Sequence, residues 1–233
     1  PGERRTGVFA WYNLVGFFAT ATGALAGGSL AHALQSSGIE PLQSYRVIVT
    51  GYALGGALLA VLFAQLSPAA EADVAGGAAP LGRPVGGRLG LHKSRGIVLR
   101  LSALFALDAF AGGFIIQSIL AYWFVLRFGA DPGQLGAIFF GANVISGLSA
   151  LLAARIAARI GLIRTMVFTH IPSNILLMCV PLMPTLPLAI VVLLIRQSIS
   201  QMDVPTRQSY TMAVVSPDER SATASITGIA RTT

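Results

Sequence analysis

Two charged residues, Asp108 and Arg196, lie in the middle of long apolar stretches of this 233-residue chain. The stretches run from Ile97 to Val125 and from Leu186 to Val214. Each charge is about ten residues from the nearer end of its stretch, which at about 1.5 Å per residue places it near the middle of a hydrocarbon layer about 30 Å thick. An ionised side chain there costs about 2.5–3.5 kcal/mol to insert unless it faces a partner or a water-filled cavity. The two residues therefore predict a polar pathway through a membrane protein.

Four further polar residues fall at the same depth in neighbouring apolar segments. They are Asn143, His170, Asn174 and Gln197. If they face one cavity with Asp108 and Arg196, the six side chains form a polar ring able to bind a substrate or carry protons, since histidine titrates near neutral pH. The two asparagines could equally hydrogen-bond between helices and serve only packing. The sequence leaves both interpretations open.

Two ion pairs are expected from the charges in these segments. Asp108 would pair with Arg196 across the cavity, because an opposite charge lowers the cost of burying both. Asp203 and Arg207 are four residues apart, a spacing that supports an ion pair within one helix. We therefore expect Asp203 to have a structural role.

The composition excludes an ordinary soluble domain. Hydrophobic residues make up 54% of the chain and charged residues only 11%, against about 25% charged in soluble domains. The net charge of +7 comes from basic residues in short loops without interleaved aromatic residues, which argues against nucleic-acid binding. Cys179 is the single cysteine and Lys93 the single lysine, so the chain offers no disulfide, no metal site and no nucleotide-binding loop. We expect no cofactor.

Six apolar segments are long enough to cross a bilayer, which needs about 20 residues. They run from Gly7 to Leu34, Ser44 to Leu66, Ile97 to Val125, Gly133 to Ile156, Leu162 to Met183 and Leu186 to Val214. A further segment begins at Ser221 and stops at Thr233, and the first residue is not Met. We therefore expect an all-α, polytopic transmembrane helical bundle that is a fragment of a longer protein.

The loop charges predict which ends of the segments share one side of the membrane. If every segment spans, one side carries Arg4, Arg5, Arg83, Arg88, Lys93, Arg95, Arg100, Arg155, Arg159, Arg164, Arg207 and Arg220. The other side carries only Arg46 and Arg127. Basic residues concentrate on the cytoplasmic side of membrane proteins, so the richer side is predicted to be cytoplasmic. Residues 67–96, rich in Ala, Gly and Pro, then form a basic cytoplasmic loop between one helical bundle ending at residue 66 and another over 97–233.

Small residues and prolines predict close packing and kinks. Gly23 with Gly27, and Gly51 with Gly55, have the spacing that lets two helix backbones approach closely. Pro172 and Pro205 should kink the fifth and sixth segments, because proline lacks the N–H that a continuous helix uses.

Two segments carry a resemblance to the major facilitator superfamily. Residues Arg196–Tyr210, followed by Ser216-Pro-Asp-Glu-Arg220, resemble the tenth helix and following loop of bacterial members. Residues 154–164 are similar to the degenerate Gly-x-x-x-Asp-Arg-x-Gly loop between helices eight and nine: Arg159 and Gly161 match and Arg164 follows, but Ala158 stands at the acidic position. By this alignment the chain holds helices five to ten and the start of eleven, and the first four helices of the same protein are missing.

The resemblance implies a secondary active transporter of the inner (plasma) membrane that moves a small solute by alternating access. Arg196 matches the arginine of the motif Arg-x-x-x-Gly, which in drug–proton antiporters is linked to proton coupling, although Ser200 replaces the glycine. Proton-linked export is therefore expected, with the lipid bilayer, a small solute and protons as partners.

Two other classes of function compete with a transporter. An enzyme within the membrane would need a nucleophile or a metal set, and the chain has no His-Glu-x-x-His and no Gly-x-Ser-x-Gly. His170 with Ser173 is the one candidate dyad, and we expect the chain not to be an enzyme. A receptor or assembly subunit is compatible with the composition, and the resemblance alone argues against it.

Overall fold

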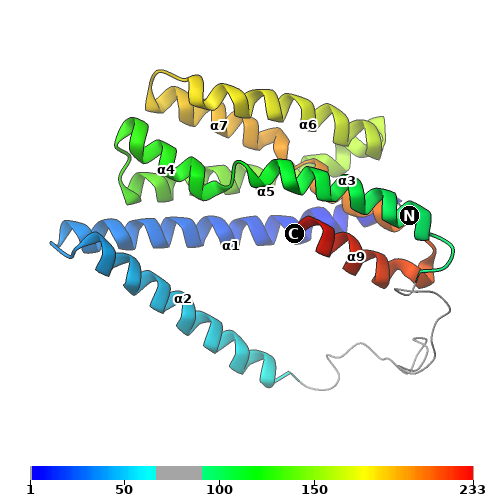
Figure 1. The fold of residues 1–233 in the computed structure, drawn as a ribbon, viewed down its shortest axis with the longest axis horizontal. Coiled ribbons are helices and arrows are strands. Elements are labelled where there is room, and N and C mark those ends of the chain that lie inside the picture. Colours follow the sequence, from blue (N-terminus) through cyan, green and yellow to red (C-terminus); the bar gives the residue numbers. More distant parts are fainter. Residues whose placement is uncertain (1, 67–90, 233) are drawn as a thin grey trace.

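A computed structural model describes residues 2–66 and 91–232, and these parts are helical with no strand (Figure 1). The helices are α1 (Gly2–Ser36), α2 (Pro41–Ala64), α3 (Arg95–Gly113), α4 (Gln117–Phe128), α5 (Pro132–Ile160), α6 (Leu162–Cys179), α7 (Leu186–Ser200), α8 (Asp203–Val214) and α9 (Arg220–Thr232), with short 3-10 turns at Val180–Leu182 and Pro217–Glu219. The predicted all-α fold is confirmed. Residues 67–90, which hold most of the predicted inter-bundle loop with Arg83 and Arg88, lie outside the described residues.

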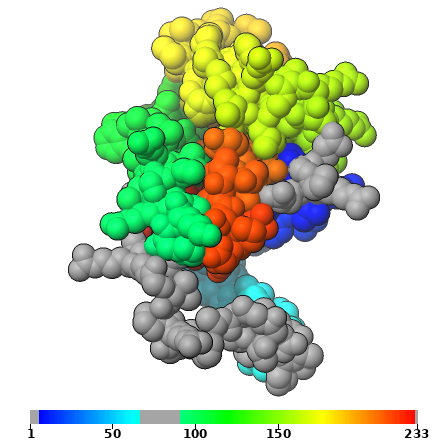
Figure 2. Space-filling model, turned by 90° about the vertical axis from the view of Figure 1, so that its right-hand side faces the viewer, coloured from blue at the N-terminus to red at the C-terminus, as the bar shows by residue number. Residues whose placement is uncertain are grey.

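The six predicted membrane segments are confirmed as helical stretches long and apolar enough to cross a membrane. Their bounds are Thr6–Ser36, Pro41–Ala64, Arg95–Phe128, Pro132–Ile160, Leu162–Leu182 and Leu186–Val214. The ends of these stretches alternate between two sides, so the start of α3, the turn between α5 and α6, and the link between α8 and α9 share one end of the molecule (Figure 2). This arrangement agrees with the alternation that the loop charges require.

The third and sixth stretches are broken near their middles, where the sequence predicted one continuous helix and one kinked helix. The first break separates α3 from α4 at residues 114–116, after Gly112 and Gly113, because glycine is a poor helix former. The second separates α7 from α8 at residues 201–202. Pro205 causes it, since its ring clashes with the carbonyl of Gln201 and it has no N–H to donate.

Two apolar clusters lie towards opposite ends of the helices. One joins the ends of α4, α6 and α7 with the start of α5, and it contains Phe124, Ala130, Ile138, Val180, Ala189 and Leu193. The other surrounds the start of α3 and contains Leu91, Val98 and Val215. The two helix breaks, at residues 114–116 and 201–202, and the polar residues near them therefore lie between two apolar layers.

α1 packs along α5, and the closest approach is at Gly28. A Cβ atom on Gly28 would lie 2.5 Å from the Pro132 carbonyl oxygen and 2.6 Å from the Gly136 Cα atom. The glycine pairs Gly23–Gly27 and Gly51–Gly55 meet no described helix, because a Cβ atom on any of these glycines would have nothing within 4 Å, and their role in close packing stays a prediction. The buried face of α1 follows Ala21, Gly28 and Ala31, a different face of the helix from Gly23 and Gly27. α2 diverges from α1 after the turn that joins them (Figure 1).

Replacement of Gly28 by leucine should separate α1 from α5 and lower the melting temperature of the purified full-length protein. The added side chain meets backbone atoms that cannot move aside, so a destabilisation of at least about 1–3 kcal/mol is expected. Gly27→Leu is the matched control, because a Cβ atom at this position meets no described residue within 4 Å. Equal melting temperatures for the two variants would contradict the close approach.

Candidate functional site

Four charged or titratable side chains from three helices form a closed ring inside the bundle. Arg207 Nη1 lies 2.9 Å from Asp108 Oδ2, and Arg207 Nη2 lies 3.3 Å from Asp203 Oδ2. His170 Nε2 lies 3.4 Å from Asp108 Oδ1, and His170 Nδ1 lies 4.0 Å from Asp203 Oδ2. Each base therefore touches both carboxylates. We call these four residues the ion ring.

The helix breaks position the ion ring. Asp203 is the first residue of α8, because Pro205 ends the preceding helix just before it. Its carboxylate therefore sits at a helix N-terminus, where unpaired backbone N–H groups and the helix dipole favour a negative charge. Arg207 follows one turn later, and its guanidinium also lies 5.4 Å from the centre of the Phe105 ring on α3. The side chains of Asp203 and Arg207 are both only 10% exposed, so these two charges are the more deeply buried members of the ring.

The predicted pair of Asp108 and Arg196 is replaced by the pair of Asp108 and Arg207. Arg196 is on α7, before the helix break, and it forms no ion pair with a described residue. Its Nη1 atom donates to Gln197 Oε1 at 2.5 Å, and its buried Nε atom has no hydrogen-bond partner. The predicted intrahelical pair of Asp203 and Arg207 is confirmed, but Arg207 is not a loop charge as the alternation scheme assumed.

The other predicted site residues line two adjoining cavities. One has a volume of about 450 Å³ and is lined by Asp108, His170, Asn174, Arg196 and Arg231 together with apolar side chains. The second, of about 240 Å³, is lined by Asn143, Arg196, Gln197 and Gln117, among others. Arg196 belongs to both, so the six residues expected at one depth line two cavities that meet at this side chain.

The asparagines differ in their surroundings. Asn143 is buried and donates from Nδ2 to the Phe139 carbonyl oxygen at 2.7 Å, a bond within its own helix rather than between helices. Asn174 is exposed to the larger cavity and forms no hydrogen bond in the described structure. His170 forms no hydrogen bond with Ser173 there either, because it is turned towards the two carboxylates.

The loop motif of residues 159–164 forms the turn between α5 and α6. Gly161 has φ +90°, a conformation that glycine adopts without strain, and it ends one helix and begins the next. Arg159 in the last turn of α5 and Arg164 in the first turn of α6 are exposed and form no ion pair with described residues. The structure thus gives Gly161 a clear local role and leaves the function of the two arginines a prediction.

Glu219 fixes the start of α3, the helix that carries Asp108. Its carboxylate accepts hydrogen bonds from the backbone N–H groups of His92, of Lys93 at 2.7 Å and of Ser94 at 2.9 Å. His92 Nδ1 lies 2.9 Å from the same carboxylate. A hydrogen bond from the Ser94 side chain, with those from the backbone, lowers the pKa of Glu219 to about 2 although burial acts in the opposite direction. The sequence contained this residue within the Ser216–Arg220 motif but gave no sign of its partner.

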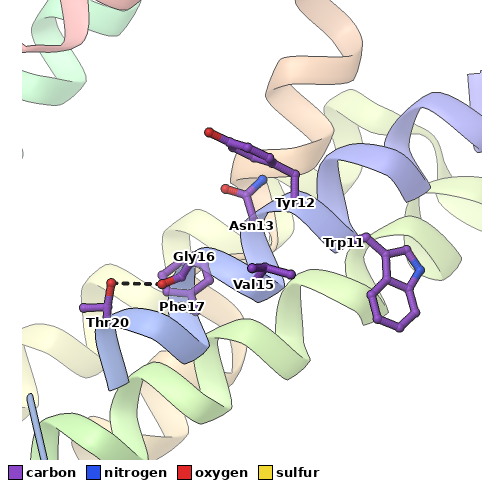
Figure 3. Close-up of a pocket in the computed structure, with 7 residues that line it drawn as sticks. All are labelled: Trp11, Tyr12, Asn13, Val15, Gly16, Phe17 and Thr20. Carbon is purple, nitrogen blue, oxygen red and sulfur yellow. Dashed lines mark hydrogen bonds between the residues drawn. The ribbon is translucent and has the colours of Figure 1, made fainter. Parts of the chain in front are cut away.

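A groove on α1 does not resemble a binding site. Its volume is about 610 Å³, and its lining consists of seven residues from that one helix, including Trp11, Tyr12 and Asn13 (Figure 3). A binding site normally brings together polar groups from several elements, and this groove does not. Trp11 and Tyr12 are exposed, as expected of aromatic residues at a membrane interface.

The fold and the site define a multi-pass helical membrane protein with a charged cluster in its interior. The chain belongs to the Major Facilitator Superfamily, whose family profile matches residues 1–233. An uncharacterized membrane protein of Saccharomyces cerevisiae, YJR124C, is 25% identical over 257 aligned residues that include 100% of this chain. The chain spans 57% of the length of that curated relative. No solved structure matches the chain.

The depressed pKa of Glu219 predicts how stability depends on pH. A carboxyl group that ionises near 2 in the folded protein and near 4.5 in the unfolded chain stabilises the fold above pH 4.5, and this contribution is lost as the pH falls towards 2. Glu219→Gln should therefore melt at a lower temperature than the parent at pH 7, with a difference that shrinks between pH 4.5 and pH 3. Asp218→Asn, which changes a largely exposed carboxylate that contacts only His92, is the matched control. A pH-independent difference for Glu219→Gln would contradict this account.

Proposed function

We propose that the chain is part of a secondary active transporter that moves a small solute by alternating access and couples export to proton entry. The ion ring is the observation that carries the proposal. Ionisable residues inside membrane segments are expensive and mark ion or substrate pathways, and broken membrane helices line such sites. Here both features coincide, since Asp203 begins the helix after one break and Asp108 lies one to two turns before the other.

The ion ring can change its charge by a single proton. Asp108 and Asp203 contribute two negative charges and Arg207 one positive charge, so the ring is singly negative with His170 neutral and uncharged with His170 protonated. A change of charge in a low-dielectric environment alters the electrostatic energy of the ring and of Arg196 and Arg231 in the adjoining cavity. Binding or loss of a proton would therefore shift the packing of α3, α6 and α8 around the ring, which is the kind of two-state element that coupling needs.

The contacts between α1 and α8 are suited to open and close in this cycle. Thr6 Oγ1 donates to Ser209 Oγ at 2.8 Å, and Asn13 Nδ2 donates to Gln208 Oε1 at 3.1 Å. In the proposed division, residues 1–66 end the first bundle and residues 97–233 begin the second, joined by the basic loop of residues 67–96. These hydrogen bonds would then join the two bundles beside the ion ring, and rocking of the bundles would break them.

The loop charges support a proposed orientation. The positively charged side, with Arg159, Arg164 and Arg220, would face the cytoplasm, and the resemblance to bacterial transporters supports an inner (plasma) membrane as the setting. An enzyme is disfavoured, because this family is typically non-enzymatic and His170 is occupied by carboxylates rather than by Ser173. A receptor would not require a proton-switchable ring.

Asp108→Asn tests the coupling role of the ion ring. The amide can still hydrogen-bond to Arg207 but leaves the ring with one carboxylate, so its charge no longer follows the same proton exchange. Gradient-driven flux in proteoliposomes of the full-length protein should be lost, while exchange of substrate without a gradient persists. Asp131→Asn is the matched control, because Asp131 is partly exposed and asparagine caps a helix equally well. Unchanged gradient-driven flux in Asp108→Asn would show that the aspartate is only structural.

A further inference from the structure

We infer that the larger cavity beside the ion ring binds a small organic anion through Arg196 and Arg231. Both guanidinium groups line this cavity, and neither forms an ion pair with a residue that the structure describes. The Nε atoms of Arg196 and Arg207 are both buried without a hydrogen-bond partner, but the Nη atoms of Arg207 meet two carboxylates, whereas Nη1 of Arg196 donates to the neutral amide of Gln197. Two cations therefore face one cavity without an ion pair to a described residue, and the carboxylates of the ring act on them only from beyond ion-pair distance.

The charge balance of the region favours an anion over a cation or a neutral solute. The ring and cavity hold two carboxylates, Asp108 and Asp203, against three guanidinium groups, Arg196, Arg207 and Arg231. The described residues thus carry one excess positive charge with His170 neutral and two with His170 protonated. Unbalanced charge inside a membrane protein is unfavourable, and a bound anion removes it.

The remaining lining indicates the shape of the anion. Arginine presents a planar set of donors that matches the oxygen atoms of a carboxylate or a phosphate. Asn174 adds an amide, and Ile115, Leu177 and Met178 form an apolar wall. A cavity of about 450 Å³ suits a small molecule. The ligand class is therefore a carboxylate or phosphate monoester on a compact apolar body. This assignment names the substrate class of the transporter proposed above and rests on that proposal only for the claim that the anion is carried.

The test is the melting temperature of the purified full-length protein with four probes that share one aromatic ring. Benzoate or phenyl phosphate should raise the melting temperature, whereas neutral benzamide and cationic benzylamine should not, and the two anions distinguish a carboxylate site from a phosphate site. Arg196→Gln and Arg231→Gln should each raise the half-saturating anion concentration about ten- to hundredfold, as expected for lost hydrogen bonds to a charged group. Arg196→Lys should retain part of the effect. Arg46→Gln, at an exposed position of α2, should change nothing.

The melting temperature of each variant without ligand shows whether the variant is folded. Arg196→Gln removes an unpaired buried charge, so without ligand it should melt at or above the temperature of the parent. No shift with either anion, an equal shift with benzamide, or unchanged anion binding in both arginine variants would overturn the anion site. Anion-specific stabilisation in a protein that shows no gradient-driven flux would reject the transport proposal and keep the site. Gradient-driven flux without anion-specific stabilisation would reject the anion site and keep the transport proposal.

Discussion

The pairing of Arg207 with two carboxylates is the interaction on which the interior of this protein depends. A charge buried in a membrane segment must meet an opposite charge or water, and Arg207 reaches Asp108 and Asp203 with separate nitrogen atoms. The pairing requires α8 to begin at Asp203, which the helix break before Pro205 provides. It also requires the Asp108 side chain on α3 to reach α8, and α3 is held by its packing against α9 and by the Glu219 carboxylate at its start.

The remaining packing protects this polar layer. Apolar clusters lie on either side of it along the helices, one around Phe124 and Leu193 and the other around Val98 and Val215. The glycine contact between α1 and α5 brings two backbones together without large side chains, as helix pairs in membranes commonly do. Because Arg207 pairs with both carboxylates of the ring, Arg196 and Arg231 face the cavity without an ion pair to a described residue. The same arrangement therefore explains a proton-responsive ring and a site with excess positive charge.

The sequence predicted those features that depend on local pattern. Hydrophobic length located the six membrane segments, and a spacing of four residues identified the pair of Asp203 and Arg207. The sequence could not decide whether Arg196 or Arg207 is the partner of Asp108. The position of a residue along its helix gives its depth, but it does not say which face of that helix meets the neighbouring helix. For the same reason the sequence could not say that Gly28 is the glycine of α1 that meets α5, since one residue changes the direction of a side chain by about 100°. The capping of α3 by Glu219 joins residues 125 to 127 positions apart and has no local signal.

A double-mutant cycle on Asp108 and Arg207 tests the central pairing most directly. The cycle compares free energies of unfolding at pH 7 for the full-length protein, Asp108→Asn, Arg207→Gln and the double variant. If the two side chains are paired, the double variant should lose less stability than the sum of the single variants, with a coupling of about 0.5–3 kcal/mol. The same cycle on Asp108 and Arg196, which form no ion pair, should give a coupling near zero. Additive losses for Asp108 and Arg207 would contradict the account.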